Sequence, residues 1–278
     1  MRLPRNWRFL ALYVALTIAS LLWLVPLATP MAVSLLPLDQ STKGWWRADW
    51  STVTLDAYAR AWDGGLNAYL GNSLVITITS VAITVVLGSL AAYAFARMKF
   101  AFKTLLFGLL ITTMIVPVQI ILIPLVPWFQ TLGLNEGAAQ YFGIALVHTA
   151  FGSGWSLFML MAFFSGIPEE VLEAARLDGA GEFTAFSRIA LPLALPGIVS
   201  FIILDFVFVW NDLLMGLTLL DSDHRPVTVG LANLNAPQLN QDDLISAGSM
   251  IAILPPLILF ALLNRYYVRG LFAGSVKG

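Results

Sequence analysis

The stretch that decides the fold is EEVLEAARLDGAGEFTAFSRIALPLALPG, residues 169–197. It is charged, with more acidic than basic residues, yet long apolar runs border it on both sides. Pro168 and the carboxylate of Glu169 suit the first turn of a helix, because proline is accepted there and negative charge complements the helix dipole. Gly179 is the expected left-handed terminator of that helix. A second short helix is predicted over 182–190, so the stretch should form helix, glycine turn, helix.

The second short helix should place Phe183, Phe186 and Ala190 on one face. Pro192 and Pro196 each lack a backbone donor, so we expect them to prevent a smooth run into the next apolar segment. An amphipathic loop resting on lipid headgroups is the alternative interpretation of the whole stretch. Anionic headgroups attract basic surfaces, however, so the acidic excess favours a protein partner.

The composition is that of a membrane protein. Of 278 residues, 59% are hydrophobic and only 11% charged, with a mean hydropathy of +0.82, whereas soluble domains carry about 25% charged residues. The net charge of −1 argues against a nucleic-acid binder, which would show a basic patch. The chain has no cysteine and only two histidines, far apart in sequence, so a thiolate or histidine-rich metal site is not expected.

Six apolar runs are long enough to cross a membrane, for which about 20 residues are needed. The third run contains Pro117, Pro124 and Pro127, and we expect kinks there. We find no internal repeat, so one all-α transmembrane domain over residues 1–278 is predicted. The spans are roughly 9–36, 70–95, 105–127, 142–164, 197–220 and 249–267.

The first run has a basic beginning and small residues near its end, as a signal peptide would. It is much longer than the apolar core of a signal, so an uncleaved span is favoured. Placing both termini in the cytoplasm leaves most Lys and Arg residues inside, as the positive-inside rule requires. The stretch around Gly179 then lies inside, while 38–69, rich in tryptophan, and the polar stretch 221–247 lie outside.

The charged stretch resembles the EAA signature of permease subunits of ABC importers. The match consists of Glu173-Ala174-Ala175, three residues, Gly179, nine residues, Ile189, one residue and Leu191-Pro192. In that family the segment forms coupling helices that dock in a cleft of a cytoplasmic ATPase. The resemblance therefore implies a cytoplasmic coupling segment over 165–196, with contact residues Glu173, Ala174, Ala175, Arg176, Asp178 and Gly179.

Two further stretches narrow this resemblance. WNDLL at 210–214 with PVTVGLANL at 226–234 looks like the fifth span and external loop of sugar-importer permeases. RGLFAGSVKG at 269–278 looks like the end of the second permease subunit in the maltose-type carbohydrate uptake group, and in this family Lys277 and Gly278 could reach the ATPase; a disordered stub is the alternative. The implied fold is that of a type I importer permease with six spans.

The resemblance also implies partners and a location. These are a second permease forming a heterodimer, two ATPase subunits that hold ATP and Mg²⁺, an extracytoplasmic sugar-binding protein that docks on the external loops, and the lipid of a bacterial or archaeal plasma membrane. No cofactor is expected on this chain. It contains no GxxxxGK[ST] loop, so it should not bind ATP by that route.

Polar residues inside spans are costly and mark functional candidates. Asn211 and Asp212, with the adjoining Trp210, are candidates for lining the sugar path, and a hydrogen-bonded network holding the bundle is the alternative. Asp205 shares a helical face with Asp212, and for it the structural role is favoured. Gln119 and His148 are weaker path candidates. Each could instead pair with a neighbouring helix, and this alternative is favoured for His148.

Other functions fit less well. Glycerol phosphate or a polyol could replace the sugar in an importer of the same kind. An ion-coupled transporter should show broken helices in corresponding halves, which we do not find. An intramembrane aspartyl enzyme needs two adjacent carboxylates, and Asp205 and Asp212 are about 10 Å apart along a helix. Small residues such as Gly88 with Ala92, and Gly152 with Ser156, should allow close helix packing.

Overall fold

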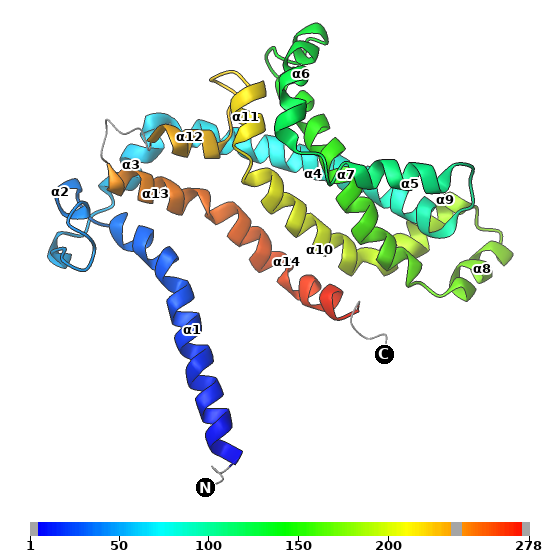
Figure 1. Cartoon of the computed structure of the whole chain (residues 1–278), viewed down its shortest axis with the longest axis horizontal. Helices are drawn as coiled ribbons and strands as arrows, with labels where there is room; N and C mark the ends of the chain where they lie inside the picture. The colour runs from blue at the N-terminus through cyan, green and yellow to red at the C-terminus, as the bar shows by residue number, and fades with distance from the viewer. Residues whose placement is uncertain (1–4, 235–240, 274–278) are drawn as a thin grey trace. The chain divides into compact units, whose positions relative to one another are not determined.

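The structure is a computed structural model that describes residues 5–234 and 241–273. Within those residues all regular secondary structure is helical (Figure 1). The chain divides into two compact units, Met1–Asn67 with Gly230–Ile253 and Ala68–Val229 with Leu254–Gly278. The tail residues Lys277 and Gly278, predicted to reach the ATPase, lie outside the described residues. The single-domain assignment stays a prediction.

In the first unit, one helix packs against three others. Helix α13 (Asp242–Ala252) packs against α1 (Arg5–Val33), α2 (Leu38–Ser41) and α3 (Asp56–Ala61). Arg60 on α3 forms ion pairs with Asp56, at 2.7 Å, and with Asp243, whose side chain is completely buried at the start of α13. The tryptophan-rich stretch 38–69 is therefore folded, with 3-10 and π turns at Trp50–Thr52 and Trp62–Leu66.

The second unit carries the charged stretch and most of the long helices. Helix α10 packs against both α7 and α14, α5 packs against α7, and α11 packs against α6 and α7. Its helices are α4 (Asn67–Arg97), α5 (Lys103–Thr112), α6 (Val118–Thr131), α7 (Ala139–Ser165), α8 (Glu169–Leu177), α9 (Glu182–Ala185), α10 (Leu191–Trp210), α11 (Leu214–Leu219) and α14 (Leu254–Ala273). Helix α12 (Val227–Leu234) is divided between the two units at Val229.

Five helical segments among the described residues are long and apolar enough to cross a membrane. The third predicted run is divided into two shorter apolar helices, α5 and α6, and Pro117 stands immediately before α6. The expected irregularity is thus a complete break at Pro117, while Pro124 and Pro127 are accommodated inside α6. The fifth run also breaks, because α10 ends at Trp210 and α11 begins at Leu214. Six spans and cytoplasmic termini stay predictions.

The expectation that Pro192 and Pro196 would interrupt the chain was wrong. Helical structure continues from Glu182 to Trp210. A π-helical turn at Phe186–Ala190 precedes α10, and the Leu191 amide donates to the Phe186 carbonyl five residues earlier. Pro192 then falls in the first turn of α10, where its missing N–H costs little.

Small residues set the spacing between α4 and α7, as predicted. A Cβ at Gly88 would lie 2.4 Å from the Ser156 hydroxyl and 2.5 Å from its Cβ. Gly71 lies on the same helix, but a Cβ there meets nothing within 4 Å. A methyl group added at Gly88 would therefore clash with Ser156, whereas one added at Gly71 would meet no neighbour.

We predict that Gly88→Ala destabilises the protein by about 1–3 kcal/mol, because the added methyl forces α4 and α7 apart. Gly71→Ala should be neutral or stabilising by up to about 1 kcal/mol, since alanine is the better helix former. Thermal unfolding of the two purified variants checks this difference. Equal melting temperatures would contradict the close approach.

Candidate functional site

The charged stretch folds as helix, glycine turn, helix. Helix α8 ends with Gly179 at φ 86°, in the left-handed region. The amide of Ala180 donates to the Ala175 carbonyl at 2.9 Å, and that of Gly179 donates to the Arg176 carbonyl at 3.0 Å. This pair of bonds is the Schellman arrangement, which needs a residue that tolerates positive φ. The prediction that Gly179 ends the first helix in a left-handed conformation is confirmed.

One face of this helix pair is buried and the other is free. Leu172 and Phe186 belong to a buried cluster together with Tyr93 of α4 and Phe164 of α7. That cluster fixes the segment to the ends of two long helices (Figure 1). Ala175 is also buried, so its small size serves packing within the chain.

The free face of α8 and α9 combines charge with apolar surface. Glu173 and Ala174 are exposed, and Leu177 and Phe183 have exposed fractions of 89% and 74%. Phe183 was expected to share a face with Phe186 and Ala190, and its ring does lie 6.3 Å from that of Phe186, but it is exposed whereas the other two are buried. The exposed leucine and phenylalanine were not identified from the sequence.

Arg97, at the end of α4, links the segment to the end of α7. Its guanidinium, only 9% exposed, donates to the Glu169 carboxylate at 2.7 Å. It also donates to the carbonyl of Phe164, at 3.0 and 2.7 Å, and to that of Ile167. These carbonyls lie where α7 ends and need partners from outside the helix. One buried cation therefore caps α7 and holds the beginning of α8.

A second set of polar contacts closes the segment on itself. Arg176 forms ion pairs with Glu182 at 2.9 Å and with Glu169 at 3.3 Å. The hydrogen bond to Glu182 is the main cause that raises the pKa of Arg176 above its usual value. The Tyr93 hydroxyl donates to Glu182 at 3.3 Å. Arg176, predicted to face the ATPase, thus also braces α8 against α9.

The path candidates gather beside the middle of α7 and the carboxyl-terminal end of α10. A cavity of about 640 Å³ is lined by Gln119, Asn211 and Asp212, so the structure brings these three predicted residues together. Trp155 of α7 and Phe208 of α10 complete its wall. Both helix breaks contribute, since Thr113 and Leu213 also line it. Irregular backbone at membrane depth is tolerated where it lines such a cavity.

Asp212 also has a structural role. Its carboxylate accepts hydrogen bonds from the amides of Met215 and Gly216 at 3.2 and 3.0 Å, at the start of α11. The imidazole of His148, buried on α7, lies 3.9 Å from the same carboxylate. Asn211 is exposed, and its side-chain amide donates to the Val207 carbonyl.

Trp210 does not line the cavity. It is 3% exposed and stacks on Phe206, with ring centroids 5.6 Å apart and planes inclined by 11°. The structure therefore gives this indole a packing contact instead of a place on the cavity wall.

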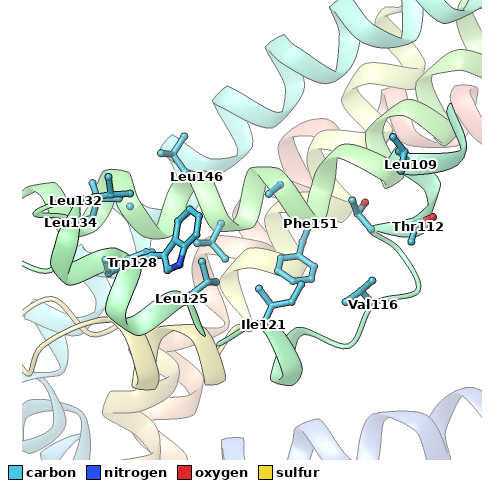
Figure 2. Close-up of a pocket in the computed structure, with 15 residues that line it drawn as sticks. Leu109, Thr112, Val116, Ile121, Leu125, Trp128, Leu132, Leu134, Leu146 and Phe151 are labelled. Atoms are coloured by element: carbon cyan, nitrogen blue, oxygen red, sulfur yellow. The ribbon is translucent and has the colours of Figure 1, made fainter. Parts of the chain in front are cut away.

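A second cavity, of about 420 Å³ between α5, α6 and α7, has a different character. Figure 2 shows its walls formed by side chains such as Leu125, Trp128 and Phe151. The hydroxyls of Thr112 and Thr113 at its edge already donate to the carbonyls of Gly108 and Leu110. It offers hydroxylated solutes almost no partners.

The turn after α11 is held by a third polar cluster. The buried side chain of Gln140 donates to Asp221 at 2.6 Å and accepts from the Asp221 amide at 2.9 Å. His224 lies 2.6 Å from the same carboxylate. Hydrogen bonds from Gln140 and His224 lower the pKa of Asp221 to about 2. The beginning of the predicted external stretch 221–247 is thereby fixed to α7.

We predict that Arg97→Gln detaches α8, because the carbonyls of Phe164 and Ile167 lose their charged donor, at a cost of about 2 kcal/mol. Amide hydrogen exchange over α8 should accelerate, while α10 is unaffected. Arg188→Gln, which removes an exposed arginine nearby, is the control. Unchanged exchange in α8 would show that the guanidinium does not hold the segment.

Comparisons with known proteins identify relatives along nearly the whole chain. The family described as binding-protein-dependent transport system inner membrane component matches residues 84–272. The osmoprotective compounds uptake permease protein GgtD of Synechocystis sp. is 35% identical, covering 98% of this chain and 93% of that protein. The trehalose transport system permease protein SugB of Mycobacterium tuberculosis is also 35% identical, covering 82% and 84%.

A solved structure shares the fold. It is a chain of a bacterial ABC transporter involved in the import of the polysaccharide alginate, with a TM-score of 0.80 over 96% of this chain and 99% of that one. The sequence identity is 21%, so this likeness concerns the fold. The predicted all-α permease fold is confirmed.

Proposed function

We propose a function from one premise: the chain belongs to the family of binding-protein-dependent transport system inner membrane components. Such chains are multi-pass permease subunits of ABC importers and not enzymes. We infer that this one carries a sugar and that, with a second permease, it encloses the path through a bacterial or archaeal plasma membrane. An extracytoplasmic binding protein delivers the sugar, and two ATPase subunits supply the energy with bound ATP and Mg²⁺.

The observation that carries the proposal is the free face of α8 and α9. It presents Glu173 and Ala174 beside the exposed Leu177 and Phe183, on a segment fixed by Arg97. A fixed apolar surface with charges at its edge is what a protein partner binds. Docking of one ATPase here would move the adjoining ends of α7 and α10.

The proposed path borders the middle of α7 and the other end of α10. The cavity of about 640 Å³ offers an amide at Gln119, an amide at Asn211 and a carboxylate at Asp212. It also offers the aromatic faces of Trp155 and Phe208. Hydrogen-bonding groups placed among apolar walls suit a solute with many hydroxyls.

The sugar assignment rests on relatives named for such substrates, including the trehalose permease. A polyol or another small solute is the second candidate, because the Synechocystis relative is named for osmoprotective compounds. Both solutes present hydroxyl groups, and the cavity alone does not separate them.

The substrate prediction is tested on the whole transporter. The chain is copurified with its partners from native membranes and reconstituted in proteoliposomes with its binding protein. Trehalose, raffinose or maltotriose should stimulate ATP hydrolysis, while glycerol 3-phosphate and sorbitol should not. Stimulation by either of the latter alone would replace the sugar assignment, and failure to copurify an ATPase would contradict the importer function.

The coupling prediction is that Glu173→Lys uncouples ATP hydrolysis from uptake. Reversal of an interface charge should weaken docking by about tenfold or more, about 1.4 kcal/mol. Gly179→Val should act similarly, since a β-branched residue is strained at φ 86°. Uptake and hydrolysis are measured in the same proteoliposomes.

Two matched controls accompany these variants. Glu136→Lys makes the same charge change just before the opposite end of α7, and Gly181→Ala alters a glycine whose φ is −71°. Both should transport normally. Normal uptake with Glu173→Lys and Gly179→Val would show that another surface docks the ATPase.

A further inference from the structure

A smaller cavity lies in the groove between α7 and α10 and has no assigned role. Its volume is about 230 Å³. Its lining residues follow each helix at intervals of three or four positions, so each helix presents one stripe. The stripes are Phe151, Trp155 and Met159 on α7 and Phe201, Asp205 and Phe208 on α10.

Asp205 is the one charged group among these lining residues. The residue is only 6% exposed. Its Oδ2 atom is buried and has no hydrogen-bond partner in the part of the chain that the structure describes. The other oxygen, Oδ1, lies 3.4 Å from the position a Cβ on Gly152 would take, so the glycine leaves room for the carboxylate.

The neighbouring hydroxyl does not satisfy this carboxylate. Thr84 also adjoins Gly152, but its hydroxyl donates to the Ser80 carbonyl at 2.8 Å, and its oxygen lies 3.2 Å from the Thr149 hydroxyl. A buried acceptor without a donor costs about 1–3 kcal/mol, and more when it is charged. The network that would have given Asp205 a structural role is therefore missing on the Oδ2 side, and a donor from outside the chain is called for.

The chemistry of the remaining wall indicates which donor fits. Trp155 and Phe208 are 53% and 56% exposed, so both present ring surface. Aromatic faces beside a carboxylate suit a solute with an apolar ring face and hydroxyl donors at its edge, since a carboxylate only accepts hydrogen bonds. An acyl chain would cover the rings but would leave the carboxylate unpaired.

The small cavity continues the proposed path. It shares Phe151, Trp155 and Phe208 with the cavity of about 640 Å³ that Asp212 lines. Asp205 lies five residues, about 7.5 Å along the helix axis, before Trp210, where α10 ends, and Asp212 follows that end. Asp205 is therefore on the side of the coupling segment. The two cavities form consecutive parts of one groove between α7 and α10.

We propose that the cavity at Asp205 is a second sugar subsite, in which the carboxylate accepts hydroxyl hydrogen bonds while a sugar ring packs on Trp155 and Phe208. The proposal rests on the function proposed above and adds a binding residue to it. A sugar leaving Asp212 would meet Asp205 next on its way inward.

The test uses the natural absence of cysteine from this chain. Leu204, 46% exposed, lines only the smaller of the two cavities, so Leu204→Cys reports on the subsite while Asp205 stays in place. Leu193→Cys, on the same helix and 54% exposed, is outside both cavities and serves as the control. The complete transporter in proteoliposomes is labelled with a charged methanethiosulfonate reagent, with and without binding protein, ATP and the stimulating sugar among trehalose, raffinose and maltotriose.

During turnover the sugar should slow labelling at Leu204→Cys by about fivefold or more and leave Leu193→Cys unchanged. Introducing Asp205→Leu beside the reporter should abolish this protection, whereas Asp205→Asn, which keeps an acceptor, should preserve part of it. If the transporter with Asp205→Leu fails to assemble, protection by sugar at Leu204→Cys but not at Leu193→Cys still tests whether the sugar occupies the smaller cavity.

Four results would overturn the subsite. Labelling at Leu204→Cys that the sugar does not slow would indicate a water-filled groove that the sugar does not enter. A reporter that is unreactive in every state while the second permease is retained would indicate a lipid-facing groove, because a charged reagent does not enter lipid. A reporter that is unreactive in every state, with loss of the second permease on Asp205→Leu, would indicate a contact between permeases. Protection that survives Asp205→Leu would remove the carboxylate from the site. In each case, stimulation of ATP hydrolysis by sugar in the wild-type transporter would still support the proposed function. Failure of the subsite and failure of the proposed function are therefore distinguishable.

Discussion

The constraint that organises this chain is that backbone polar groups in lipid must find partners within the protein. A helix satisfies them, and an interruption is tolerated only where side chains or water replace the lost bonds. The second unit has two such interruptions in its apolar helices, before Pro117 and after Trp210, and both border the same cavity. At the second, the Asp212 carboxylate receives the amides of Met215 and Gly216. The breaks thus place polar groups beside the cavity proposed as the path.

Helices α7 and α10 connect this cavity to the charged segment. The segment is the link between them, since α8 follows α7 and α9 leads without interruption into α10. Arg97 adds α4 to the same assembly through three carbonyl and carboxylate partners. A displacement of α8 would therefore act on α4, α7 and α10 together, as the proposed coupling of this surface to the cavity requires.

The sequence was most informative where the determinant is local. The turn at Gly179 follows from the backbone freedom of glycine at the end of a helix. Close packing at Gly88 and at Ser156 was predicted from small-residue spacing within each helix, whereas the contact between these two residues was not. Arg97 was counted only as a cytoplasmic charge, because its partners lie about seventy positions away and no local pattern announces them. The continuous helix through Pro192 was missed for a related reason, since a π turn has no simple sequence signature. The burial of Trp210 likewise depends on tertiary packing.

The turn that ends α8 has a consequence for selectivity. Its last carbonyls are already occupied, Ala174 by the amide of Asp178, Ala175 by that of Ala180 and Arg176 by that of Gly179. A partner that approaches this end finds few free backbone acceptors and must discriminate through side chains such as Leu177 and Phe183. When side chains determine which partner binds, a point substitution can change the partner without disturbing the turn. With an ATPase docked here as proposed, substitutions at Leu177 or Phe183 would change which ATPase binds while the backbone of the turn stays the same.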